Sequence, residues 1–249
     1  YSKEVYKHYF EMVDPAKRYF LQTDMDEFAK YETKLDDYLS GGDLTFFKLT
    51  TDRLLQRADE IDAMTQEIFK SPINLDQDET FILDAKNKKY PKDKAELLTE
   101  WKKYVKYNIL QEMESLNAKE KSQKELKDSL QRNKLKDTVN LKILTPEQKR
   151  AKATDEVKDL LSDSFRRFKR VKRMESFSRY MNAYTEVFDP HSNYFSPQDK
   201  DDFDTSFKGK IIGIGAMIQE KKGYLYLGAL TVGAPAWKSK QLSDGDKIL

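Results

Sequence analysis

Apolar residues recur three and four positions apart through most of residues 1–205, which is the period of an amphipathic α-helix. The first helical stretch ends at Asp14-Pro15, because proline disfavours helical geometry in the residue before it. Further helical patterns begin near Thr23 or Asp24, after Gly41-Gly42-Asp43 and after Tyr90-Pro91. The pattern therefore predicts a multi-helix domain over residues 1–205.

The helix predicted after Gly42 carries an apolar residue at every seventh position, namely Phe47, Leu54, Ile61 and Ile68. Such a seam is typical of a coiled coil between two chains and also of a helix packed inside a bundle. We favour the second interpretation, because a seam this short in a globular chain is usually an intramolecular contact.

The apolar pattern weakens between Lys119 and Asn140, where scattered leucines lie among charged residues. This stretch is either an exposed helix or a mobile connection. A long helix is predicted to begin at Thr145-Pro146, because proline fits the first helical position and Gln148 can complete a capping box. Its apolar positions continue to Val187, so one helix is predicted from about 146 to 187.

The last forty residues follow a different pattern, in which glycines separate short apolar runs. The sequence predicts strands over 210–218 and 224–227 joined by a tight turn, followed by a short helix at Pro235 and a third strand after Gly245. The predicted fold class is mainly α, with a multi-helix N-terminal domain over 1–205 and a truncated β-rich module over 206–249.

Composition narrows the classes of protein that fit. The 45 Lys and Arg residues nearly balance the 43 Asp and Glu residues, so the net charge of +2 gives no global field that favours nucleic acid or membrane. The absence of cysteine excludes disulfides, thiol catalysis and cysteine-ligated zinc. No apolar run approaches the roughly 20 residues of a membrane span.

Residues 165–173 contain six cations in nine positions, which raises the possibility of a nucleic-acid contact. We favour a solvated helix face with Phe165 and Phe168 turned inward, because flanking acids cancel the local field. No nucleic-acid partner is therefore expected.

Asp189, His191 and Ser192 lie within four residues of one another and have the composition of a catalytic triad. Triad members normally converge from separate elements, so one proline-stiffened turn is poorly suited to that role. We expect His191 to satisfy backbone groups at a domain junction instead. His8 is the only other histidine, and neither a metal site nor a cofactor is predicted.

Three short motifs near the C-terminal end carry a family resemblance. Gly-Ile-Gly-Ala at 213–216, Gly-x-Pro-Ala at 233–236 and Gly-Asp-x-Ile at 245–248 follow one another as in the first part of a PDZ domain. The opening motif resembles that of the tail-specific, or C-terminal processing, proteases. Two upstream segments resemble the same family, because 14–28 and 189–197 look like the start of its helical N-terminal domain and the segment before its PDZ domain.

The chemistry of the first motif fits recognition of a free peptide C-terminus. Its glycines let consecutive N–H groups point into one concavity, which can bind a carboxylate. The strand that follows can accept an extended peptide at its edge, with apolar side chains forming a pocket for the terminal residue. The predicted substrate-tail site comprises the backbone amides of Gly213, Ile214, Gly215 and Ala216 and the side chain of Ile218.

The resemblance implies a serine endopeptidase that recognises the C-terminal tails of substrate proteins and cleaves upstream with a Ser-Lys dyad. In that family the dyad lies in a protease domain after the PDZ domain, so residues 1–249 are expected to contain no catalytic residue. The resemblance also implies an adaptor protein as a partner of the helical domain and a periplasmic location, with the signal peptide outside this chain.

The alternative is a non-enzymatic helical scaffold with a PDZ-like module for partner binding. The second wall of a PDZ groove is a later helix, which residues 1–249 are not expected to include. We therefore expect these residues alone to bind C-terminal peptides weakly or not at all.

Overall fold

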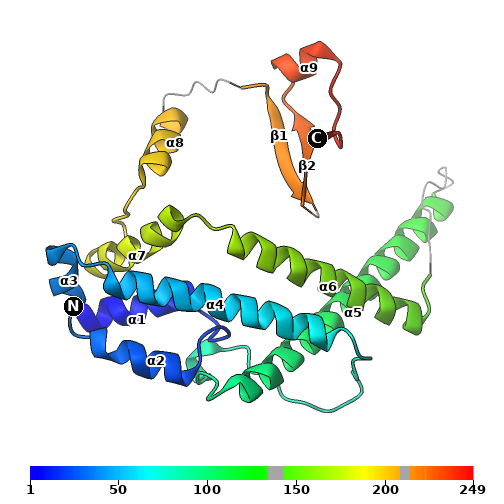
Figure 1. The fold of residues 1–249 in the computed structure, drawn as a ribbon. Helices are drawn as coiled ribbons and strands as arrows, with labels where there is room; N and C mark the ends of the chain where they lie inside the picture. Colours follow the sequence, from blue (N-terminus) through cyan, green and yellow to red (C-terminus); the bar gives the residue numbers. More distant parts are fainter. Residues whose placement is uncertain (134–142, 208–212, 222, 249) are drawn as a thin grey trace. The chain divides into compact units, whose positions relative to one another are not determined.

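A computed structural model describes residues 1–133, 143–207, 213–221 and 223–248. The chain divides into two compact units, Tyr1–Ser192 and Asn193–Leu249 (Figure 1). Most described residues are helical, and a small antiparallel sheet lies near the C-terminal end, so the predicted mainly α class is confirmed.

Two 3₁₀ turns of the first unit, Ala29–Tyr31 and Ala85–Asn87, lie between its helices. The helices are Ser2–Val13 (α1), Gln22–Phe28 (α2), Leu35–Gly41 (α3), Thr45–Ile68 (α4), Lys94–Arg132 (α5), Pro146–Lys169 (α6) and Arg173–Phe188 (α7). Within the described ranges, none of the helices is long and apolar enough to cross a bilayer.

Helix α4 belongs to both apolar clusters of this unit. Its N-terminal half, through Phe46 and Phe47, packs with α1, α2, α3 and α7. Its C-terminal half, through Ile61 and Ile68, packs with α5 and α6. The predicted seven-residue seam is buried inside a single chain, so its packing is intramolecular.

The long helix predicted from 146 to 187 is instead two helices. Its start is as predicted, because Thr145 and Gln148 form a capping box around Pro146. The helix ends at Lys169, and Lys172 has extended backbone geometry before α7 begins. The break changes the buried face, since α6 packs on α5 through residues such as Leu161 whereas α7 packs on α1 through Tyr180.

The second unit contains a helix, α8 (Pro197–Phe207), that the apolar pattern did not predict. Its start has a capping-box pattern, because the Ser196 N–H donates to Asp199 Oδ2 at 3.1 Å and the Asp199 N–H donates to Ser196 Oγ at 3.2 Å. Ser-Pro-x-Asp at 196–199 was the sequence signal for this helix.

The sheet of the second unit has the strand order β1-β2-β3 and is antiparallel. Its strands are Ala216–Lys221 (β1), Tyr224–Leu230 (β2) and Lys247–Ile248 (β3), and the short helix Pro235–Ser239 (α9) precedes β3. The first part of the strand predicted from 210, residues 210–212, lies outside the described residues. Within the described sheet, β1 is an edge strand.

Candidate functional site

The predicted substrate-tail site lies on the loop that enters β1 and on β1 itself. The carbonyl oxygen of Ile214 accepts a hydrogen bond from the Ala236 N–H at 2.9 Å, and that of Gly215 accepts one from the Thr231 N–H at 2.8 Å. These two bonds direct the carbonyl groups of the loop toward residues 231–236. These bonds between backbone atoms hold the loop against residues 231–236.

Gly215 is required by both conformation and space. Its φ of +75° lies in the left-handed region, and a Cβ atom built there would lie 2.1 Å from the Cβ of Ala234. The first motif therefore packs directly on the second, Gly-x-Pro-Ala at 233–236. The third motif contacts β2, because Gly245 N–H donates to the Leu227 carbonyl at 2.8 Å. The fold thus connects all three motifs.

The apolar members of the site are open to solvent. Ile214 is 49% exposed and Ile218 is 55% exposed. The pairing of β1 with β2 shifts register between Ala216 and Ile218, which marks a bulge at the start of the strand. The five predicted residues consequently share one loop and one edge strand.

The segment containing His191 does not form a triad. Asp189 accepts hydrogen bonds from the His191 backbone N–H at 3.2 Å and from the Ser192 hydroxyl at 2.9 Å, while the His191 residue is exposed. The backbone-satisfying role predicted for His191 therefore belongs to Asp189. Short polar side chains of this kind commonly cap turns, and Asp-Pro was the available signal.

The basic run at 165–173 is partly paired with acids. Lys169 Nζ lies 2.9 Å from Asp59 Oδ1 and 2.7 Å from Asp62 Oδ2 on α4, and these hydrogen bonds raise the pKa of Lys169. Phe165 is buried. Both observations agree with a helix that turns one face to solvent and the opposite face to the core.

The second acid of the 14–28 segment, Asp24, forms a buried ionic cluster that sequence reasoning missed. It is fully buried and accepts hydrogen bonds from Arg57 Nε at 2.8 Å, Arg57 Nη2 at 2.9 Å and the Leu21 N–H at 2.9 Å. Arg53 also contacts Asp24 through Nη1, and its Nη2 donates to Glu27 Oε2 at 2.7 Å. Burial by itself raises the pKa of Asp24, but the hydrogen bonds outweigh it and hold the pKa below its usual value.

The first acid, Asp14, holds the turn between α1 and α2. Its carboxylate accepts hydrogen bonds from the N–H groups of Arg18, Tyr19 and Phe20 at 2.8 to 3.1 Å. Burial raises the pKa of Asp14 despite these bonds. Asp14 and Asp24 are therefore structural.

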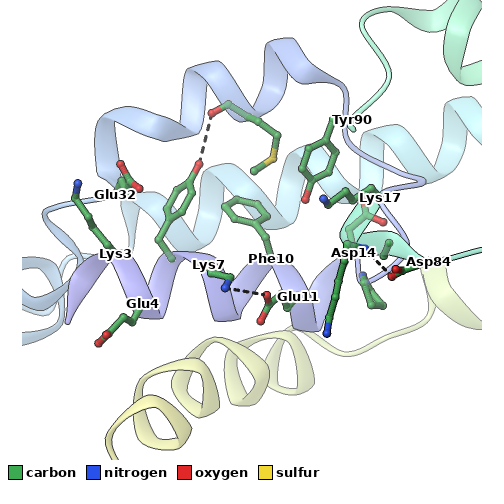
Figure 2. A pocket seen from close by; sticks show the side chains of 15 residues that line it. Lys3, Glu4, Lys7, Phe10, Glu11, Asp14, Lys17, Glu32, Asp84 and Tyr90 are labelled. Carbon is green, nitrogen blue, oxygen red and sulfur yellow. Dashed lines mark hydrogen bonds and ion pairs between the residues drawn. The ribbon is translucent and has the colours of Figure 1, made fainter. Parts of the chain in front are cut away.

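A groove lies beside α1 in the helical unit, and we call it the α1 groove (Figure 2). It has a volume of about 790 Å³. Its walls are α1, Met25 of α2 and the segment around Ala85, and its floor is mainly apolar. Figure 2 shows Phe10 and Tyr90 at its centre, with Lys3 and Glu32 toward one end and Lys17 and Asp84 toward the other.

Acidic residues are too dispersed in the described ranges to suggest a metal centre. There, no group of three or more His, Asp or Glu side chains is placed to hold a metal ion.

Comparisons with known proteins bear on the whole chain. Residues 1–198 match the sequence model of the tail-specific protease N-terminal domain. The chain belongs to the tail-specific protease family. A curated relative, the tail-specific protease of Haemophilus influenzae, is 28% identical over 250 residues that cover all of this chain and 32% of that protein. The chain thus spans about a third of the length of this relative, and it comprises the N-terminal region of a tail-specific protease.

Proposed function

We propose that this region serves a serine endopeptidase by recognising the C-terminal tails of its protein substrates. The recognition site comprises Gly213, Ile214, Gly215 and Ala216 through their backbone amides, with Ile218 contributing to an apolar pocket. Residues 206–249 are the first part of a PDZ domain in this proposal, and residues 1–205 form the helical N-terminal domain. Cleavage by a Ser-Lys dyad takes place in a domain beyond residue 249, in the periplasm.

The observation that carries the proposal is the edge position of β1 immediately after the glycine loop. An edge strand can pair with an extended peptide through backbone hydrogen bonds. The loop carbonyls of Ile214 and Gly215 are bound to residues 231–236, which favours presentation of loop N–H groups on the other side. A peptide aligned on β1 with its carboxylate at the loop would meet the exposed side chains of Ile214 and Ile218.

The test is a fluorescence-anisotropy titration of the full-length protein with two labelled peptides. Both end in the same apolar residues, and they differ only in having a free or an amidated C-terminus. The free carboxylate is expected to bind at least tenfold more tightly, because the amide removes the charge that the loop recognises. Equal affinities for the two peptides would rule out carboxylate recognition.

A pair of variants separates the pocket from the loop. Ile218→Ser is expected to weaken binding of the free-carboxylate peptide by roughly tenfold, since it removes most of one apolar contact. Gln219→Ala, at the next position of β1 and on the opposite face of the strand, is the matched control and should leave the affinity unchanged. An equal loss in both variants would contradict the assigned face.

A further inference from the structure

We propose that an aromatic face at α8 packs against the part of the full-length protein that follows residue 249. The face comprises the side chains of Phe195, Phe203 and Phe207, and we call it the α8 face. It contains no residue of the predicted tail site, so the proposal does not depend on tail recognition.

The three phenylalanine rings form one row. The ring centroids of Phe195 and Phe203 are 5.4 Å apart, and those of Phe203 and Phe207 are 4.9 Å apart. Phe203 and Phe207 are four positions apart, which places both on the same face of the helix. Phe195 precedes the helix and extends the row toward its N-terminal end. The α8 face is therefore a continuous apolar surface.

The row is open to solvent. Phe195 is 48% exposed, Phe203 is 44% exposed and Phe207 is 78% exposed. A phenylalanine side chain has a surface of roughly 200 Å², so the three rings together expose on the order of 300 Å². Apolar patches of this size are among the largest on soluble monomers and are often binding surfaces. The α8 face therefore fits contact with another polypeptide surface.

The acidic side chains beside the row already have partners. The pairs lie within the helix and its cap: Asp199 with Ser196, Asp202 with Gln198, and Asp204 with Lys200. The donor and acceptor atoms of these pairs are 2.7, 3.3 and 3.1 Å apart, respectively. An apolar side chain that covers the rings would leave these contacts intact, so the chemistry of the occupant is apolar.

The unit that contains α8 has little apolar core of its own. Among its described residues, the buried apolar side chains are those of Leu227 and Ala236, whereas the helical unit has two buried apolar clusters. A unit of this size with so small a core is not expected to be stable alone, because it buries too little apolar surface. It therefore needs cover from further polypeptide.

The same protein can supply that polypeptide. The chain covers only 32% of the Haemophilus influenzae relative, and residues 1–198 match an N-terminal domain, so most of the remaining length of such a protein follows the matched region. A segment of the same polypeptide has a high effective concentration at α8, whereas a separate partner binds only when its own concentration is sufficient. This difference favours the chain beyond residue 249 as the occupant.

Docking of α8 would also restrict the position of the predicted tail site. Five residues, 208–212, separate Phe207 from Gly213, and they can span at most about 20 Å. A docked α8 would therefore keep the loop at 213–216 near the chain that packs on the helix. This consequence rests on the proposed function, but the docking itself does not.

The test is site-specific photo-crosslinking in the full-length protein. The photoreactive amino acid p-benzoylphenylalanine replaces Phe207 in one variant and Thr205 in the matched control. Thr205 is exposed and lies two positions from Phe203 and Phe207, which places it on the opposite face of α8. Mass spectrometry then identifies the crosslinked residues. The variant at Phe207 should crosslink to residues beyond 249, with a yield several-fold above that of the control.

The other crosslinking outcomes would overturn the proposal. Crosslinks from position 207 to residues 1–192 would assign the α8 face to the helical unit, and a crosslinked dimer would assign it to a second copy of the protein. Equal yields at positions 205 and 207, or no crosslink at either, would show that the α8 face is uncovered in the full-length protein.

A pair of aspartate variants measures the same contact without a crosslinker. Phe203→Asp places a charge in the covered row and should speed amide hydrogen exchange in residues 197–207 at least about tenfold, because α8 loses its docking contact. Thr205→Asp adds the same charge on the opposite face and should leave exchange unchanged. The control lies nearer the C-terminal end of α8, where a negative charge is less favourable, so an effect of the helix dipole would be larger in the control. Equal exchange in the two variants would contradict the proposal.

Discussion

The helical unit buries several residues of its 14–28 motif, whereas the β-containing unit exposes the apolar residues of its predicted tail site. Phe20, Asp24 and Phe28 are fully buried, and Asp24 is held by two arginines. In contrast, Ile214 and Ile218 are about half exposed on a loop and an edge strand. The 14–28 motif thus contributes residues to a structural core, whereas the predicted tail site presents apolar side chains at an accessible surface.

The difference extends beyond the motifs. Helix α4 connects two apolar clusters in the helical unit, and aromatic rings from α1, α2, α4 and α7 contact one another there. In the second unit several large apolar side chains are exposed, including those of Phe207, Val232 and Trp237. Substitutions should therefore change stability in the first unit and binding in the second.

The largest expected effect is that of Asp24→Asn. The substitution removes the charge that pairs with Arg53 and Arg57 and leaves them without their buried partner, so we expect a loss of about 3 kcal/mol in the free energy of unfolding. Urea unfolding followed by circular dichroism at the helical band measures it. Asp26→Asn, an exposed neighbour on α2, is the control and should change stability by less than about 0.5 kcal/mol. A loss below about 1 kcal/mol in Asp24→Asn would mean that the ionic cluster does not stabilise the helical unit.

The same residue predicts a pH dependence. The folded-state pKa of Asp24 lies below the value of about 3.9 expected in the unfolded chain, so its stabilisation is present above that value and is lost as pH falls through the folded pKa. Between about pH 5 and pH 2, the wild-type protein should lose more stability than Asp24→Asn. Parallel pH profiles for the two proteins would contradict the assigned role.

Gly215→Ala should affect binding and leave the helical unit unchanged. The new Cβ atom would meet the Cβ of Ala234 and would occupy a backbone conformation that alanine rarely adopts. We expect at least a tenfold loss of affinity for a free-carboxylate peptide in the full-length protein, with no change in helical unfolding. Gly41→Ala, on α3 and outside the predicted site, is the control, because no described atom lies within 4 Å of the position of its Cβ. Equal losses of affinity in both variants would contradict the role assigned to the loop.

The smallest effect is expected for Lys169→Ala. Its contacts with Asp59 and Asp62 lie at the surface of α4, and exposed ion pairs contribute about 1 kcal/mol or less. Thermal unfolding at low and high salt measures this contribution, which should shrink at high salt. A large loss of stability that does not depend on salt would show that Lys169 stabilises the fold as strongly as a buried ionic group such as Asp24.

The periodic elements could be predicted from the sequence because burial follows the helical repeat. The seam of α4 and the capping box of α6 are examples. The break before α7 could not be predicted, since apolar spacing continues through it and only tertiary packing changes the buried face. The ionic cluster around Asp24 was also missed, because Arg53 and Arg57 are distant in sequence and their convergence depends on how α2 meets α4.

For the candidate site, glycine spacing indicated the loop, and the structure adds the contact between Gly215 and Ala234. The α1 groove gave no sequence signal. Its lining comes from α1, α2 and the 84–90 segment, and its polar residues look like any solvated helix face.

The most direct test of the contrast between the two units is hydrogen–deuterium exchange of the full-length protein with and without a saturating apolar-tailed peptide. The free-carboxylate peptide should slow amide exchange in residues 213–221 and leave exchange in residues 1–192 unchanged, and the amidated peptide should change exchange in neither region. Protection confined to the helical unit, or equal protection by the amidated peptide, would contradict recognition of the tail at β1.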